Sequence, residues 1–236
     1  MKYVAALILL AVPAVAQERP ETFGLPAGCD AFVTVQGTSC QVEHHFTCAG
    51  DPEGHQRRVS LDERGLTYAG QIDNETQWIA SFHALTGHSE QLESNPVEPA
   101  SLSELIETGE DAYDFRTMSD MFGETRFVGR DTLTGRQVTI DGVTLDETSY
   151  DITAYDAAGN EIWTSQGNEF ISRNWRTFLS GTGTVTTAED TFEKDDRPVE
   201  FIFPGEPGFL SAQPKYGCGL AISAAPYSEE TPHDHI

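Results

Sequence analysis

Apolar and polar residues alternate along most of this chain, which is the pattern of β-strands with one buried face. The alternating runs are separated by short segments rich in Gly, Asp, Asn and Pro, which are typical of hairpin turns. We therefore expect a series of antiparallel strands. Their predicted ranges are 31–36, 41–48, 56–62, 66–72, 77–85, 88–92, 112–119, 124–132, 136–140, 143–155, 160–173, 175–180, 183–187 and 198–203.

The clearest turn is Asp141-Gly142, which stands between alternating runs that end at Ile140 and begin at Val143. Asp and Gly both tolerate the positive φ angles that a two-residue type I′ turn requires. The sequence therefore predicts a tight hairpin at this point.

One helix is predicted near residues 101–108. Ser101 and Glu104 have the spacing of a capping box, and Gly109 can take the left-handed conformation that ends a helix. The apolar positions that share one face of this helix are Leu102, Leu105 and Ile106.

These elements predict a mainly β fold, in which a twisted antiparallel sheet curls into a partial barrel with one short helix. Residues 17–223 are long enough for a single β-rich domain. Within it we expect an N-terminal β segment (29–95), a linker and helix (96–110) and a β meander (111–218).

The two ends of the chain have patterns of their own. Residues 1–16 resemble a bacterial signal peptide, because Lys2 precedes an apolar stretch and Ala14-Val15-Ala16 has the small residues of a cleavage site. The stretch is shorter than the roughly 20 residues that span a bilayer. Residues 224–236 are polar without periodicity, so we expect a disordered tail. The mature protein is therefore expected to be periplasmic or secreted.

The charge balance limits the classes of partner that the protein is expected to bind. Of 236 residues, 38 are Asp or Glu and 14 are Lys or Arg, so the formal net charge is −24. A chain this acidic lacks a basic face for phosphates, so we expect no nucleic-acid partner. No later segment is long and apolar enough for membrane insertion. We expect an acidic globular protein that is soluble.

Export makes the four cysteines informative, because disulfides persist in oxidising compartments. A hairpin over residues 29–48 would place Cys29 opposite Cys48, which leaves Cys40 to pair with Cys218. The alternative connectivity joins Cys29 to Cys40 and Cys48 to Cys218. The other facing pairs of this hairpin would be Ala31 with Phe46, Val33 with His44, and Val35 with Val42.

No motif for catalysis or metal binding is evident. The chain lacks G-x-S-x-G, S-x-x-K, H-E-x-x-H and phosphate-binding glycine patterns. His44 shares a face with apolar residues, which favours a core histidine, and His45 lies on the opposite face. A metal shared by His44 or His83 and a sheet carboxylate, or by the tail histidines His233 and His235, is the weaker interpretation. We expect no metal, no cofactor and, on balance, no enzyme.

The segment 168–181 carries bulky residues on both faces of a predicted strand. Ile171, Trp175 and Leu179 alternate there with Phe170, Arg176 and Phe178. Such a segment either fills a core on both sides or lines an apolar pocket on one side. In the second case the ligand-binding residues would be Trp175, Phe178, Phe170 and Arg176.

The expected architecture is similar in outline to the half-barrel carriers of the periplasm, such as lipoprotein-sorting chaperones, in which a helical lid covers a curved sheet. The similarity rests on the signal, the strand pattern and the helix. It implies a periplasmic carrier or binding protein for an apolar or amphipathic ligand. The alternative hypothesis is a non-catalytic structural or protein-interaction module of the cell envelope.

Overall fold

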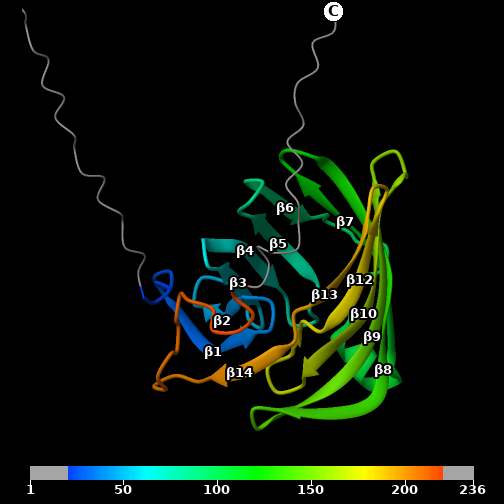
Figure 1. Ribbon diagram of the computed structural model, residues 1–236. Coiled ribbons are helices and arrows are strands. Elements are labelled where there is room, and N and C mark those ends of the chain that lie inside the picture. The colour runs from blue at the N-terminus through cyan, green and yellow to red at the C-terminus, as the bar shows by residue number, and fades with distance from the viewer. Residues whose placement is uncertain (1–20, 220–236) are drawn as a thin grey trace, which may run out of the picture.

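The computed structural model describes residues 21–219. All its strands belong to one antiparallel sheet that curls without closing into a barrel (Figure 1). The elements are β1 (Cys29–Gly37), β2 (Val42–Cys48), β3 (Gln56–Asp62), β4 (Gly65–Ile72), β5 (Trp78–His83), β6 (His88–Leu92), α1 (Leu102–Thr108), β7 (Glu110–Ser119), β8 (Gly123–Ile140), β9 (Val143–Asp156), β10 (Glu161–Ser172), β11 (Thr177–Leu179), β12 (Thr182–Thr187), β13 (Thr191–Asp195) and β14 (Pro198–Ile202). The mainly β, curled fold expected from the sequence is thus confirmed.

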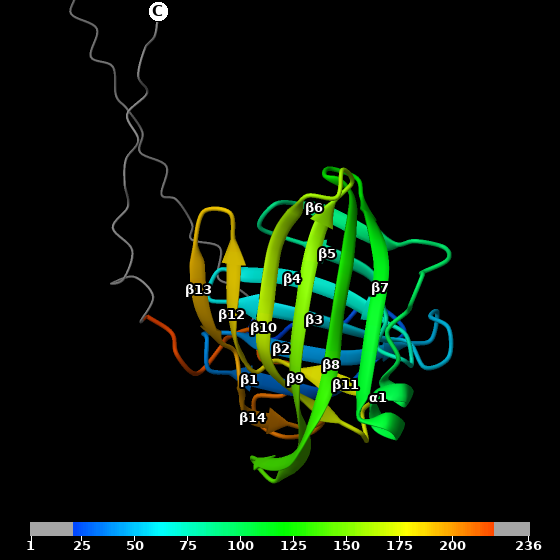
Figure 2. The ribbon, with the colours of Figure 1, turned by 90° about the vertical axis from the view of Figure 1, so that its right-hand side faces the viewer.

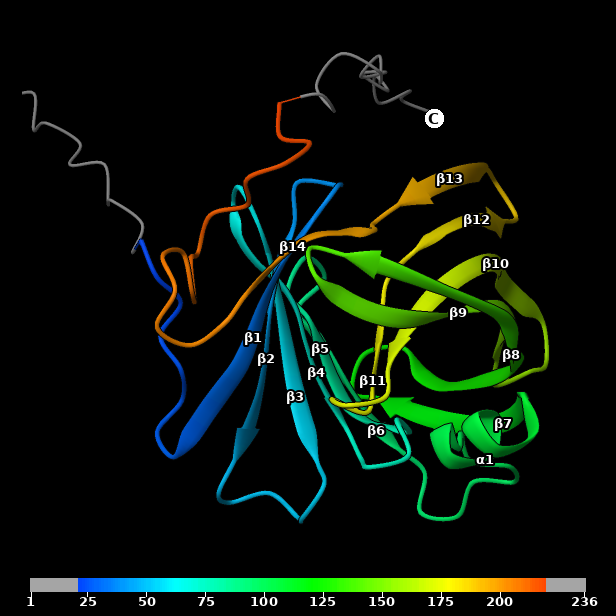
Figure 3. The ribbon, with the colours of Figure 1, turned by 90° about the horizontal axis from the view of Figure 1, so that it is seen from below.

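Each strand pairs with the next along the chain from β1 to β10, and β12 and β13 then extend the sheet beyond β10. β11 pairs separately with β10, and β14 returns to pair with β1. The sheet therefore has two halves, which face each other as walls when the molecule is seen from below (Figure 3). The strands of the first half run across those of the second (Figure 2).

The outer face of β1–β3 is covered by the two ends of the described chain. Phe23, Leu25 and Ala212 pack there against a cluster on β2 and β3. Gln36 is fully buried on β1, where it accepts a hydrogen bond from the backbone N–H of Lys215. These segments cover the outer face of β1 and satisfy the polar groups of Gln36. β1 is therefore buried on both faces. The buried members of the cluster on β2 and β3 are Val42, Phe46, Val59 and Leu61.

A second apolar cluster joins the start of the sheet to its far half. Val33 and Val35 of β1 and Phe201 of β14 pack there against residues of β9, β10 and β11. The Phe201 N–H also donates to Asp141 at the tip of the β8–β9 hairpin, at 2.8 Å. These contacts hold the curl of the sheet, although no backbone ladder closes it.

The short helix begins and ends as predicted. The Ser101 hydroxyl accepts from the Glu104 N–H at 3.2 Å, and Gly109 ends the helix in the left-handed conformation. The second arm of the expected capping box is replaced, because the Ser101 N–H donates to the carboxylate of Asp111 instead. Leu102 and Leu105 are buried against Ile171, so α1 packs at one end of the sheet.

The predicted type I′ turn is confirmed, since Asp141 and Gly142 have φ angles of 45° and 79°. The prediction of two strands at 124–132 and 136–140 was wrong. They form one strand, β8, because the segment around Gly135 is a bulge that leaves the pairing with β9 in place. The strand β13 was missed, since its sequence is charged and largely exposed.

The first hairpin has the expected ends and a different middle. Cys29 faces Cys48 and Ala31 faces Phe46, but Val33 faces His45 and Val35 faces Glu43. The predicted pairs of Val33 with His44 and Val35 with Val42 were wrong. An irregularity between Ala31 and Val33 adds one residue to β1, which shifts the register by one position.

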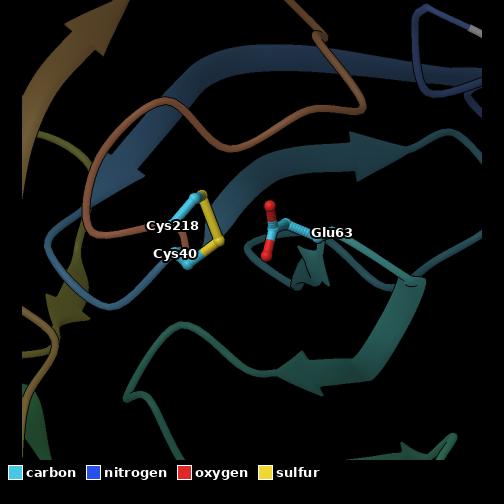
Figure 4. Close-up of side chains that lie close together, drawn as sticks. All are labelled: Cys40, Glu63 and Cys218. Carbon is cyan, nitrogen blue, oxygen red and sulfur yellow. A yellow bond between two sulfur atoms is a disulfide. The ribbon is translucent and has the colours of Figure 1, made fainter. Parts of the chain in front are cut away.

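The structure contains two disulfides, Cys29–Cys48 and Cys40–Cys218. They correspond to the first of the two connectivities considered. Cys40–Cys218 ties the segment after β14 to the β1–β2 turn, and the carboxylate of Glu63 lies beside its sulfur atoms (Figure 4).

Some expectations fall outside residues 21–219, namely the signal peptide at 1–16 and the disordered tail at 224–236. Within the described residues, no helix has the length and apolar character needed to cross a membrane.

Candidate ligand-binding site on the concave face

The concave face of β2–β6 is polar, and we call it the polar wall. Directly opposite residues on neighbouring strands share a face, so the pairing register places these side chains in two rows. The first row across β2–β6 is Glu43, Ser60, Tyr68, His83 and His88. The second row is His45, Arg58, Gly70, Ser81 and Glu90.

The facing half of the sheet is aromatic and apolar on its concave side, and we call it the aromatic wall. Its members on β7–β10 are Tyr113, Phe115, Phe127, Tyr150, Ile152, Ala154 and Trp163. Trp78, at the start of β5, contacts Phe115 and Phe127 edge to face, with ring centroids 5.5 and 5.2 Å apart. The Trp78 side chain remains accessible, since 43% of the residue is exposed. The interior therefore has a polar side on β2–β6 and an opposite side that carries this aromatic cluster.

Tyrosine rings lie flat on both walls, over glycines. A Cβ atom at Gly70 would be 2.3 Å from the hydroxyl oxygen of Tyr68, and one at Gly183 would be 2.5 Å from that of Tyr150. Glycine is needed at these positions because any side chain would displace the ring. These two tyrosine rings thus lie against the backbone of the sheet.

Arg58 is the cation at the centre of the polar wall. Its guanidinium lies over the ring of Tyr68, 5.1 Å from the centroid, and one nitrogen is 3.7 Å from a carboxylate oxygen of Glu43. With residues 21–219 it makes no hydrogen bond of normal geometry. Although it lies deep in the fold, 34% of its side chain is exposed. Its neighbours are thus Tyr68 and Glu43, and the exposed part of its guanidinium can bind a further group.

Lys194 is the second cation directed to the interior. Its ammonium lies 5.6 Å from the centroid of the Tyr150 ring, and within the described chain it forms no ion pair. The other Arg and Lys side chains of residues 21–219 each have a carboxylate oxygen within 3.3 Å. In a chain with so many acids, two interior cations without such partners are exceptional.

The interior carboxyl groups differ in their ionisation. Burial would raise the pKa of Glu43, but Arg58, His45 and the Ser60 hydroxyl outweigh it and hold that pKa at about 2. Burial raises the pKa of Glu169, which faces both Arg58 and Lys194. Glu43 is therefore the ionised partner of Arg58, whereas burial raises the pKa of Glu169 in spite of the opposing effect of Lys194 and Arg58.

Asp131 is a third interior carboxyl group. Burial, together with the charges of Glu169, Asp111 and Asp151, raises its pKa to about 8. A neutral carboxyl does not repel an anion and can donate a hydrogen bond. The interior is thus less negative than the composition of the chain suggests.

The segment proposed from the sequence as a ligand site is divided by a turn. The prediction that Ile171, Trp175 and Leu179 share a face was wrong, because residues 173–176 form a turn with Arg176 at a positive φ of 47°. Phe170 instead faces Leu179 across β10 and β11.

The four residues of that segment lie in different surroundings. Phe170 is buried in the cluster between β1 and β9–β11, and Trp175 packs at its edge against Phe201, with ring centroids 5.6 Å apart. Phe178 packs against the helix cluster. Arg176 forms an ion pair with Glu75 at 3.0 Å. The structure therefore brings Phe170 and Trp175 into one cluster and places Phe178 and Arg176 in other surroundings.

His44 is fully buried on the outer face, as expected for a core histidine. Its Nδ1 hydrogen-bonds the Thr34 hydroxyl at 2.9 Å, while its Nε2 has no partner among the described residues. Burial lowers the pKa of His44 to about 4, so the ring is neutral at physiological pH.

Sequence reasoning missed the two walls. One signal was present: Arg58 and Ser60, like Ser81 and His83, are polar at alternate positions of predicted strands. Comparisons with protein-family models, with curated proteins and with solved structures found no match for this chain.

Proposed function

We propose that this protein binds an anionic amphiphile, a small molecule with one acidic head group on an apolar body, between the two walls. The single observation that carries the proposal is Arg58, a guanidinium on the concave face that is 34% exposed and whose nearest carboxylate oxygen among the described residues lies 3.7 Å away, beyond hydrogen-bond distance. A carboxylate or similar acid satisfies two guanidinium donors at once, which makes arginine the usual partner for such groups.

The aromatic wall supports the apolar part of the ligand. Trp78 offers an accessible indole that already packs on Phe115 and Phe127, so a chain or ring placed against it extends an existing apolar surface. Binding sites for small molecules commonly combine such a surface with a few placed polar groups.

The carrier role predicted from the sequence is compatible with these features. The two disulfides fit an oxidising compartment outside the cytoplasm. We therefore propose an exported binding protein, with the periplasm as its place of action.

The test uses dansyl-undecanoate, a fluorescent fatty acid, and its uncharged methyl ester. Binding should appear as dansyl emission excited by energy transfer from tryptophan, and the acid should bind at least tenfold more tightly than the ester. Arg58→Gln should remove that preference, because the charged hydrogen bonds to the head group are lost.

Arg57→Gln is the matched control. Arg57 is the neighbouring residue on β3, points to the opposite face and is held by Asp51 at 2.6 Å, so its loss should leave the affinity unchanged. Trp78→Ala should weaken the acid and the ester equally. The proposal is overturned if neither probe binds, or if Arg58→Gln and Arg57→Gln have the same effect.

A further inference from the structure

The hairpin of β5 and β6 carries two histidines and a glutamate on one face. His83 is the last residue of β5 and His88 the first of β6, and they pair directly. Their rings are stacked with centroids 4.5 Å apart and planes 4° from parallel. Glu90 lies two positions further along β6, on the same face. The potential ligand atoms of the three side chains all lie within 4.8 Å of one another.

Hydrogen bonds around the cluster orient these groups. The Thr86 hydroxyl lies 2.6 Å from Nδ1 of His88 and itself points to the carbonyl oxygen of His83. When the hydroxyl proton is directed to that carbonyl, the Nδ1–H of His88 donates to the Thr86 oxygen, and the lone pair on Nε2 is left for a metal ion. The carboxylate of Glu90 accepts from the hydroxyl of Thr117 at 3.2 Å. A hydrogen bond on the far side of a ligand is the usual support of a metal site.

The Nε2 of His88 has no hydrogen bond to the described chain, although the residue is only 9% exposed. A Glu90 oxygen lies 3.6 Å from this nitrogen, which is beyond hydrogen-bond distance. The edge of Phe122 closes the other side of the ring, with centroids 4.8 Å apart. With its lone pair on Nε2, His88 presents an acceptor to the Glu90 carboxylate, and a cation between the two atoms would satisfy both.

We propose that His83, His88 and Glu90 bind a divalent transition-metal ion of the zinc type. Two imidazole nitrogens and one carboxylate oxygen form a set of three protein ligands, which leaves a fourth position for water or another molecule. In a tetrahedral zinc site the ligand atoms are about 3.3 Å apart. The present ligand atoms lie within 4.8 Å of one another, and metal binding would require side-chain rotations that unstack the two rings and bring these atoms to that spacing.

The ligand set also determines which ions do not fit. Calcium and magnesium prefer oxygen ligands, so a site with two imidazoles selects against them. The described residues contain one other cluster of this kind, Cys40, Glu63 and Cys218. Its two sulfur atoms are joined to each other and are not available as thiolates.

This inference does not depend on the proposed amphiphile binding. The experiment is calorimetric titration of Zn²⁺ into the metal-free full chain, in a background in which His233→Gln and His235→Gln remove the tail histidines. We expect one ion per chain. Co²⁺ substitution should give the intense visible absorption of a four- or five-coordinate site.

The double variant His83→Gln/His88→Gln should weaken Zn²⁺ binding at least a hundredfold, and Glu90→Gln should weaken it at least tenfold. His55→Gln is the control, because His55 lies outside the cluster, where its ring contacts Gln71. Circular dichroism establishes that each variant is folded. The proposal is overturned if the background protein binds no Zn²⁺, or if folded cluster variants bind it as the control does.

Discussion

The ring of Tyr113 lies across Gly129 of the neighbouring strand, so close that a Cβ atom at Gly129 would be 2.6 Å from the tyrosine oxygen. The same atom would be 2.5 Å from the carbonyl oxygen of Asp151. Since the backbone cannot yield at this point, the glycine is what allows the tyrosine to lie flat on the aromatic wall.

Gly129→Ala should therefore destabilise the protein, by about 1–3 kcal/mol, which is typical of overpacking in a well-packed interior. Urea unfolding measures the effect. Gly50→Ala is the control, because a Cβ atom there meets nothing within 4 Å. Equal unfolding midpoints for the two variants would contradict the packing described.

The two disulfides should differ in their contribution to stability. They close loops with sequence separations of 19 and 178 residues. The chain-entropy argument assigns about 3 kcal/mol to the short loop and about 5 kcal/mol to the long one. Cys40→Ala/Cys218→Ala should thus lower the free energy of unfolding more than Cys29→Ala/Cys48→Ala. The opposite order would show that the Cys40–Cys218 disulfide does not stabilise the protein mainly by restricting the unfolded chain.

Asp131 should make the stability depend on pH. Its pKa is about 8 in the folded protein against 3.8 for the free side chain. Between these values the folded chain holds a proton that the unfolded chain has released, so stability falls as the pH rises, by about 1.4 kcal/mol per unit. The contribution is fully present below pH 3.8 and is lost as the pH passes 8.

Asp131→Asn should flatten this dependence, because the amide does not titrate. Urea unfolding between pH 5 and pH 8 gives the slopes, and the variant should exceed the wild type in stability at pH 8. Asp30→Asn, at an exposed position of β1, should keep the wild-type slope. If the stability of Asp131→Asn had the wild-type slope against pH, the pH dependence would come from another titratable group.

Trp175 should act as a core residue. Its ring packs on Phe32, Phe201 and Phe203. Trp175→Ala should cost about 3 kcal/mol of stability, as deletion of large aromatics in cores does. Phe192→Ala, at a residue that is 50% exposed, should cost much less. Unchanged affinity for dansyl-undecanoate in the folded variant is expected. If the variant lost binding and kept its stability, Trp175 would instead be a ligand-binding residue.

Most strands could be predicted from alternation and turn residues, because both signals are local. Asp141-Gly142 determines the hairpin turn, and Ser101 and Gly109 determine the two caps of the helix. The errors arose where a strand contains an extra residue, as between Ala31 and Val33 and around Gly135. A bulge changes which residues face each other, and nothing in the alternation marks it.

The candidate site could not be predicted for a related reason. Glu43, Arg58, Tyr68 and His83 come from four successive strands, and they become neighbours only through the register of three ladders. Each strand alone reads as a run with polar residues on one side, which normally indicates a surface exposed to solvent. Only the curl of the sheet turns that side inward.

The pairing of β1 with β14 determines when the fold can be completed. Thr34 lies opposite Ile202, so β1, the first strand of residues 21–219 to be synthesised, cannot complete its pairing before β14, the last of them. Until then one edge of β1 has open hydrogen-bonding groups, the kind of edge that recruits other chains. Contacts so distant in sequence also form slowly. A truncated product that lacks β14 would retain a permanent unpaired edge, and it should aggregate where the complete chain does not.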